Sequence, residues 1–393
     1  MEKKVNRWLM LVLGSLVLLG AGVIYAWSVL NKGLPFQGVE LSLCFTLTLC
    51  FFCIGGLISG LISGKTTLRF RLILAAVLTG GGFAVTAFHN QQVLLLYLGY
   101  GVLAGGGIGI VYNTVIAAVS GYFGDRKGLC SGVLMMAFGF SALLLGKLAD
   151  ALGSLETIGW QKTYLLYGAG LFVLLLAGAF LLKSPPKKEG KAQAAAGAEG
   201  EDISPKEMLK RASFWKLFVF FTLLAAVGST AIGFGRKFYQ SVGMEESAAV
   251  TAAGLLSIFN GLGRIVSGTL YDRLGMRKGQ MLTSAVAITA CALSLLGVLT
   301  GAPVLGLVGL SLCAFSYGFS PTMSAALVGS FYGMKYYSLN FPLLNMVLIP
   351  ASFMSTLAAG LVEASGGSYL TTFCVLLGAS LVGLGINWTI RKP

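Results

Sequence analysis

Twelve long apolar stretches constrain the fold more than any other feature of this sequence. Each is long enough for a helix to cross a hydrocarbon core of roughly 30 Å. Their expected bounds are 8–30, 41–64, 71–88, 93–119, 129–150, 164–183, 214–235, 249–271, 280–300, 304–331, 338–363 and 369–390. Only 11% of the residues are charged, whereas soluble domains carry about 25%. The sequence therefore predicts an all-α polytopic membrane protein with twelve transmembrane helices.

A polar segment divides these stretches into two sets of six. From 184 to 213 the chain is charged or low in complexity, which predicts a cytoplasmic linker. Ser204, Pro205 and Glu207 have the spacing of a capping box with proline at the first helical position, so the linker should end in a short surface helix. We therefore expect two six-helix bundles, 1–183 and 214–393.

An internal repeat supports this division. A shift of 208 positions aligns Gly55, Ile58, Ser59, Gly60, Lys65 and Arg69 with Gly263, Val266, Ser267, Gly268, Arg273 and Arg277. The same shift aligns Gly121, Phe123 and Lys127 with Gly329, Phe331 and Lys335. The halves should be parallel repeats that move about a site near the membrane midplane.

The net charge of +14 is explained by topology. Most lysines and arginines lie near alternate ends of the predicted spans, on the side that carries both termini. The positive-inside rule places that side in the cytoplasm. The charge distribution therefore favours a cell membrane protein with the lipid bilayer as its surroundings and no nucleic-acid partner.

One arginine, Arg264, lies within the apolar stretch 249–271. A charge at the centre of a membrane helix costs about 2.5–3.5 kcal/mol on insertion scales, so such residues usually face a bundle interior or a water-filled path. At helical spacing it shares a face with Ser257, Asn260, Ser267 and Tyr271. A guanidinium can bind a carboxylate through two parallel hydrogen bonds. The alternative is a structural charge satisfied by helix-end carbonyl groups.

Further polar and aromatic residues are candidates for the same cavity. Asn260 could orient Arg264, bind substrate, or link helices. Three tyrosines could complete the hydrogen bonds of a bound carboxylate or serve in packing and the interfacial belt. Two more intramembrane asparagines are cavity candidates by default. These five are Tyr25, Tyr112, Tyr317, Asn113 and Asn345.

The turn after the eighth stretch carries Gly268, Asp272, Arg273 and Arg277. This turn resembles the loop signature of the major facilitator superfamily. The resemblance implies a gate, with Gly268 allowing close helix contact and Asp272 bonding a neighbouring helix end. The alternative is a basic turn that only sets topology.

Within that superfamily the chain resembles the oxalate/formate antiporter family, which is related to monocarboxylate transporters. The resemblance covers essentially the whole chain and is carried by residues 22–29, 107–112, 121–123, 126–128, 259–264 and 331–335. It implies a small organic anion bound by Arg264 and surrounded by aromatic rings.

One departure from the family bears on the substrate. Oxalate-transporting members carry a lysine in the eleventh span, near the position of Leu348, yet no lysine or arginine occurs between Tyr336 and Arg391. A dicarboxylate would leave one charge unpaired, which favours a monocarboxylate such as formate or lactate.

None of the fourteen acidic residues lies near the middle of a span, so a dedicated proton-carrying carboxylate is missing. We therefore expect exchange by alternating access. The alternatives are a proton-coupled monocarboxylate symporter, an oxalate/formate antiporter and, more remotely, a membrane receptor or enzyme. The sequence contains no catalytic motif and no metal-ligand cluster, so we expect no enzyme activity, no metal and no cofactor. We expect a monomer.

Overall fold

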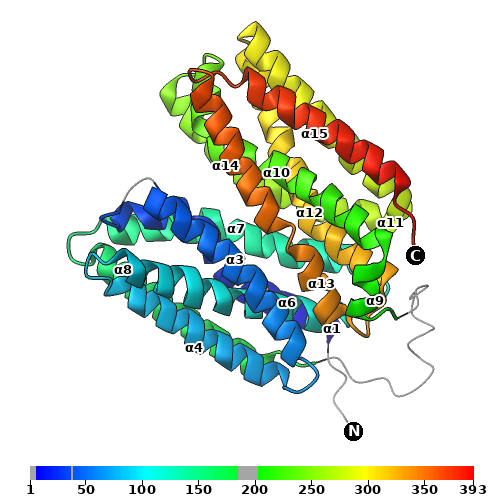
Figure 1. The fold of residues 1–393 in the computed structure, drawn as a ribbon. Helices are drawn as coiled ribbons and strands as arrows, with labels where there is room; N and C mark the ends of the chain where they lie inside the picture. The colour runs from blue at the N-terminus through cyan, green and yellow to red at the C-terminus, as the bar shows by residue number, and fades with distance from the viewer. Residues whose placement is uncertain (1–5, 37–38, 185–201) are drawn as a thin grey trace. The chain divides into compact units, whose positions relative to one another are not determined.

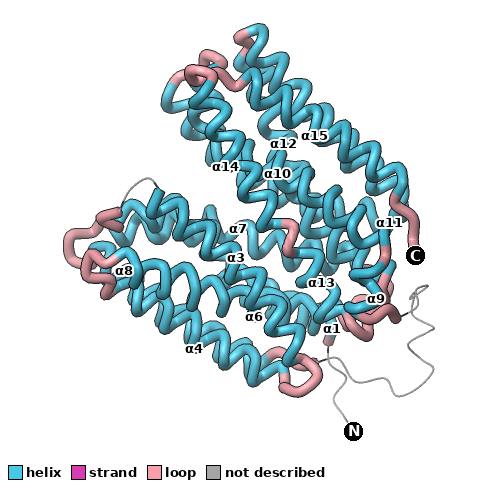
Figure 2. Tube along the Cα trace, viewed as in Figure 1, coloured by secondary structure: helices cyan, strands magenta, loops and turns pink. Residues whose placement is uncertain are grey.

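The computed structural model describes residues 6–36, 39–184 and 202–393, and in these ranges the chain forms helices and no strand (Figures 1 and 2). Most of the predicted linker, residues 185–201, lies outside the described residues. The all-α prediction is confirmed.

The elements before residue 184 match the first six predicted spans to within a few residues. They are α1 (Arg7–Ala21), η1 (Gly22–Ala26), α2 (Trp27–Leu30), η2 (Asn31–Gly33), α3 (Val39–Ile62), α4 (Leu68–Ala87), α5 (Val93–Leu96), η3 (Tyr97–Ala104), α6 (Gly105–Ser120), α7 (Lys127–Gly153) and α8 (Gly159–Leu181). The first span is interrupted by the 3₁₀ turn η1, and the fourth contains the π-helical segment η3.

The elements after residue 202 match the other six. They are α9 (Pro205–Lys210), α10 (Ala212–Ser241), α11 (Glu246–Thr300), α12 (Pro303–Phe331), α13 (Tyr337–Asn345), α14 (Leu348–Ala364) and α15 (Leu370–Thr389). The predicted capping box is confirmed at α9, where Ser204 and Glu207 exchange hydrogen bonds.

In the described residues, eleven helical stretches are long and apolar enough to cross a membrane. One of them, α11, has 55 residues and contains a non-helical residue, Gly275, with φ 75° and ψ 173°. Only glycine adopts this backbone conformation readily. Because α11 comprises two helices on either side of Gly275, the count agrees with the twelve predicted spans.

The chain forms two compact units. The first comprises Met1–Asp125, Val133–Asp202 and Met334–Leu343, and the second comprises Arg126–Gly132, Ile203–Gly333 and Leu344–Pro393. Each unit thus includes a short helical segment from the opposite half of the sequence. The predicted bundle boundaries, 1–183 and 214–393, stay a prediction.

Large apolar side chains cover the outer faces of the helices. Val77 on α4, Val173 on α8 and Val382 on α15 are all more than half exposed. Such surfaces are unfavourable in water and suit a lipid environment. Within the first unit, α4 lies beside both α8 and α6 (Figure 1).

Candidate functional site: a buried arginine and an aromatic group

Arg264 lies on the buried face of α11, inside the second unit. Its exposed fraction is 1%, and those of Asn260 and Ser267 are 8% and 1%. The neighbouring residues Phe259 and Leu262, on the other side of the helix, are exposed, as a helix with one lipid-facing side requires. The predicted polar face is therefore present and points into the unit.

Glycines bring other helices against the backbone around Arg264. A β-carbon at Gly318 of α12 would lie 2.2 Å from the carbonyl oxygen of Asn260, and one at Gly263 would lie 2.0 Å from that of Phe315. A β-carbon at Gly132 of α7 would lie 2.7 Å from the carbonyl oxygen of Arg264. Only glycine fits at such contacts, so backbone packing on several sides fixes this turn of α11.

Asn260 lies one turn before Arg264. Its buried Oδ1 atom accepts no hydrogen bond from the described residues. Leaving a buried acceptor without a hydrogen bond costs about 1–3 kcal/mol, so a hydrogen bond from a nearby donor to this atom would be favourable.

The other two candidates of the second unit differ in their surroundings. Tyr317 packs against the buried alanines Ala225, Ala226 and Ala351. Asn345 is buried and ends α13, and two turn residues separate it from Leu348 at the start of α14. The eleventh span is thus broken beside the position where the family pattern places a lysine.

Two of the candidate tyrosines contact the same phenylalanine ring in the first unit. Phe138 of α7 contacts Tyr25 and Tyr112, with ring centroids 5.4 and 4.9 Å apart. Phe52 of α3 contacts Tyr112 and Phe138, and Phe341 of α13 stacks on Tyr112. We call Tyr25, Phe52, Tyr112, Phe138 and Phe341 the aromatic group.

The 3₁₀ turn η1 explains how Tyr25 reaches this group. A β-carbon at Gly22 would lie 2.0 Å from the carbonyl oxygen of Phe138. The absence of a side chain at Gly22 therefore allows η1 to lie directly against α7, with Tyr25 beside the Phe138 ring.

Asn113 links helices of the first unit. Its Nδ2 group donates hydrogen bonds to the carbonyl oxygens of Gly56, at 3.0 Å, and Ser338, at 2.9 Å. Both amide hydrogens are thereby used, and only the buried Oδ1 atom has no partner among the described residues. Because a carboxylate needs donors, Asn113 is better placed to position helices than to bind an anion.

The predicted gating residues make two separate sets of contacts. The carboxylate of Asp272 accepts hydrogen bonds from the N–H groups of Gly128, at 3.0 Å, and Leu129, at 2.8 Å, in the first turn of α7. The predicted bond to a helix end is thus present. A β-carbon at Gly268 would lie 2.2 Å from the carbonyl oxygen of Gly128, as expected for a close helix contact.

Arg277 and Arg273 do not contribute to that contact. The Arg277 guanidinium donates to the carbonyl oxygens of Asn387, Trp388 and Ile390 at the end of α15. Arg273 is exposed and makes no ion pair with any described residue.

Sequence reasoning missed Phe52, Phe138 and Phe341. Phenylalanine is common in apolar spans, so no motif distinguished these three, and only the fold places them beside Tyr112. It also missed Arg71, which is buried in the first turn of α4 with its Nη1 atom 3.5 Å from the carbonyl oxygen of Ser59. No group of His, Cys, Asp or Glu among the described residues could hold a metal ion.

The sequence profile described as the Major Facilitator Superfamily matches residues 7–348. The chain belongs to this superfamily, and it is a multi-pass membrane transporter rather than an enzyme. The expected superfamily and its fold are confirmed.

Several curated relatives refine this placement. An uncharacterized MFS-type transporter of Escherichia coli (strain K12), YhjX, is 28% identical over 343 residues, covering 86% of this chain and 83% of the relative. The oxalate:formate antiporter of Oxalobacter formigenes is 24% identical, covering 84% of this chain and 80% of its own. Monocarboxylate transporter 12 of Xenopus laevis is 26% identical over 59% of this chain and 54% of its own.

A solved structure agrees in fold. The E. coli fucose:proton symporter FucP superposes with a TM-score of 0.72 over 98% of both chains. Its sequence identity is 16%, so the similarity concerns the fold alone.

Proposed function

We propose that this chain exchanges small monocarboxylate anions across a membrane by alternating access, with Arg264 as the carboxylate-binding group. The observation that carries the proposal is the 1% exposure of an arginine within a transmembrane helix. A buried membrane charge is costly, and function is the usual reason for retaining one. The names of the oxalate:formate antiporter and of the monocarboxylate transporter reported above are in keeping with this role.

Asn260 has a defined part in this proposal. Its Oδ1 atom has no partner among the described residues, and we propose that it accepts a hydrogen bond from the Arg264 guanidinium when substrate binds. A pair of parallel guanidinium N–H groups then binds the substrate carboxylate. Tyr317 and Asn345 belong to the same unit and are proposed as further contacts.

The aromatic group of the first unit is proposed as a substrate contact in its own right. Its rings give an apolar surface suited to the short carbon chain of a monocarboxylate, and the Tyr25 and Tyr112 hydroxyl groups are candidate donors. Asn113 holds α6 in place beside this group.

A monocarboxylate fits the charges better than a dicarboxylate. The eleventh span offers Leu348 where a second cation would lie. The other buried cation noted above, Arg71, lies in the first turn of α4 and thus near a membrane face rather than at the centre of a span.

Exchange fits the acidic residues better than proton coupling. Three carboxylates that form ion pairs in the described part of the chain, Asp125, Asp150 and Glu246, are exposed. A loaded carrier would reorient with a substrate carboxylate beside the Arg264 guanidinium, whereas an empty carrier would reorient without that anion.

Counterflow in proteoliposomes tests both the exchange mechanism and the role of Arg264. Labelled formate or lactate should enter rapidly only when unlabelled anion is inside. Arg264→Lys should slow exchange by about tenfold or more, because an ammonium does not reproduce the guanidinium fork. Arg236→Lys is the matched control, since it keeps an exposed ion pair with Glu246.

Three outcomes would overturn parts of the proposal. Net uptake as fast as exchange would exclude an obligatory exchanger. Uptake driven by an imposed pH gradient without internal anion would indicate a proton symporter. Stronger competition by oxalate than by formate or lactate would indicate a dicarboxylate substrate.

We also propose that the transporter is a monomer in the cell membrane with both termini cytoplasmic. The basic residues at alternate span ends support this orientation. Labelling of single cysteines placed at 190 and at 301 with a membrane-impermeant reagent in intact cells should modify only the second.

A further inference from the structure

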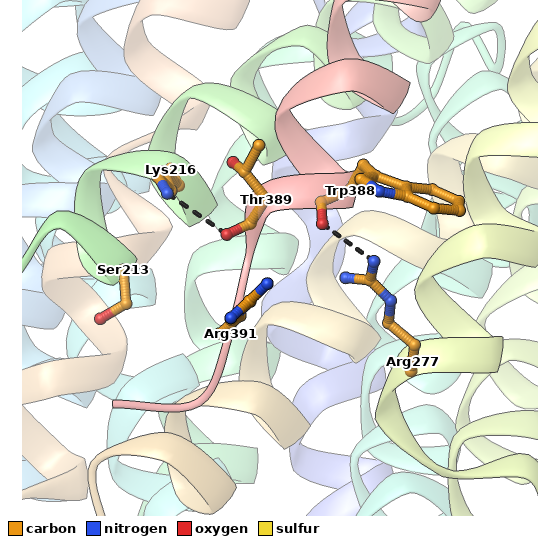
Figure 3. Close-up of a pocket in the computed structure, with 6 residues that line it drawn as sticks. All are labelled: Ser213, Lys216, Arg277, Trp388, Thr389 and Arg391. Atoms are coloured by element: carbon orange, nitrogen blue, oxygen red, sulfur yellow. Dashed lines mark hydrogen bonds between the residues drawn. The ribbon is translucent and has the colours of Figure 1, made fainter.

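A basic pocket lies in the second unit, away from Arg264. It has a volume of about 430 Å³ and is formed where α10 begins, α11 continues beyond Gly275 and α15 ends (Figure 3). Its lining residues are Ser213, Lys216, Arg277, Trp388, Thr389 and Arg391. The volume lies in the range of small-molecule sites, which is roughly 300–1,000 Å³.

The lining carries three cations and no carboxylate. Lys216 donates to the carbonyl oxygen of Thr389 at 3.2 Å, and Arg277 donates to three carbonyl oxygens of the same helix end. A helix C-terminus carries only about half a negative charge, so these contacts leave the pocket strongly positive. None of the three cations pairs with an acidic residue in the part of the chain that the structure describes.

The cations that line the pocket keep hydrogen-bond donors that a ligand could use. A guanidinium has five N–H groups, and the contacts of Arg277 leave its Nε and one Nη2 hydrogen unused. Lys216 retains two ammonium hydrogens, and the exposed Arg391 makes no hydrogen bond with the described residues. Together these donors match the several oxygen atoms of a phosphate group.

Two tryptophans place this pocket at the level of the lipid headgroups. Trp388 is 67% exposed and Trp215 is 51% exposed, at the end of one predicted span and the start of another. Exposed tryptophans at span ends mark the membrane–water interface. The Arg277 guanidinium lies 5.2 Å from the Trp388 ring centroid, which keeps this cation at that level.

We propose that this pocket binds the phosphate headgroup of an anionic phospholipid. Basic pockets between transmembrane helix ends suit such headgroups, and the interfacial position favours a lipid over a soluble phosphate compound. Arg264 lies about 16 Å along α11 before Gly275 at 1.5 Å per residue, so the headgroup site is separate from the proposed carboxylate site.

The test measures thermal stabilisation of the full chain in detergent on titration with dioctanoyl phosphatidylglycerol. Dioctanoyl phosphatidylcholine and glycerol 3-phosphate are titrated in parallel. We expect saturable stabilisation by phosphatidylglycerol only, and an apparent affinity about tenfold weaker in Lys216→Gln and in Arg391→Gln. Lys237→Gln, at the other end of α10, removes the same charge and should leave the affinity unchanged.

The two pocket variants serve different purposes. Lys216 also bonds the end of α15, so its replacement could disturb folding, whereas Arg391 makes no such bond. Equal stabilisation by phosphatidylcholine, or unchanged affinity in Arg391→Gln, would overturn the proposal. Saturation by glycerol 3-phosphate at equal affinity would show that the occupant is a soluble phosphate compound and would overturn the lipid assignment.

Discussion

The carboxylate of Asp272 accepts a hydrogen bond from the backbone N–H of Gly128, 3.0 Å away. Because Leu129 donates to the same carboxylate, Asp272 acts as the anion at the start of α7. The first N–H groups of a helix have no partner within it, and the helix dipole favours a negative charge there. This contact joins the turn after the eighth span to α7 within the second unit.

Replacing Asp272 by Asn should weaken this contact. The lost charge is worth about 1 kcal/mol at a helix N-terminus, which corresponds to about a fivefold change in an equilibrium between two states. We expect exchange in proteoliposomes to change by that factor while the substrate affinity stays within twofold. Asp150→Asn removes an exposed ion pair and should have no effect; an equal effect of both variants would exclude a special role for Asp272.

Adding a methyl group at Gly318 should displace α11. The new β-carbon would lie 2.2 Å from the carbonyl oxygen of Asn260, and a backbone atom cannot rotate away. Overpacking costs about 1–3 kcal/mol, so Gly318→Ala should lower the unfolding temperature and reduce exchange.

Gly254→Ala is the control for that variant. Gly254 lies on α11, the helix that Gly318 contacts, and a β-carbon there meets no atom within 4 Å. The Gly254→Ala substitution should leave the unfolding temperature unchanged or raise it slightly, because alanine favours the helix. A Gly318→Ala protein that matches Gly254→Ala in both measurements would contradict the close contact.

Asn260→Asp should introduce pH dependence. A carboxylate one turn before Arg264 would neutralise the guanidinium in the empty carrier and compete with the substrate at neutral pH. Protonation at lower pH would release the guanidinium, so the substrate affinity should rise as the pH falls. We expect uptake driven by an inward proton gradient without internal anion, which Asn260→Gln should not show. Identical pH profiles of the two variants would count against Asn260 as the neighbour of the binding group.

The stability of α9 should depend on pH through Glu207. Hydrogen bonds from the Ser204 side chain and backbone hold the pKa of Glu207 below its ordinary value. A carboxyl group with a lowered pKa contributes stability above its unfolded pKa, about 4.3, and loses it as the pH falls through the folded value. Amide hydrogen exchange in α9 should therefore be slower in the wild type than in Glu207→Gln at pH 7, and the difference should shrink as the pH falls below the unfolded pKa and vanish below the folded pKa. A difference that persists at low pH would contradict this assignment.

The spans and the buried arginine follow from the sequence because both depend on local patterns. A twenty-residue apolar run specifies a membrane helix without reference to its neighbours. The helical period likewise places Asn260, Arg264 and Ser267 on one face, which the burial of all three confirms.

Long-range packing accounts for what the sequence did not reveal. Phe138 meets Tyr25 only because Gly22 allows two backbones to touch, and the period of one helix carries no such information. Arg277 was grouped with Asp272 by sequence proximity, yet it caps a helix that begins 93 positions later in the chain, at Leu370. The break before Leu348 likewise lies in an apolar run, where Pro342 is the one clear sequence signal that the helix is interrupted.

The conformation of Gly275 has a consequence for the direction of the chain. Without it, α11 would be a single rod of about 80 Å, more than twice the thickness of the hydrocarbon core. With it, the polypeptide reverses and crosses the bilayer once more, which changes an odd number of crossings into an even one. We therefore expect that one residue without a side chain decides on which face of the membrane every later loop, and the basic pocket at the end of α15, is found.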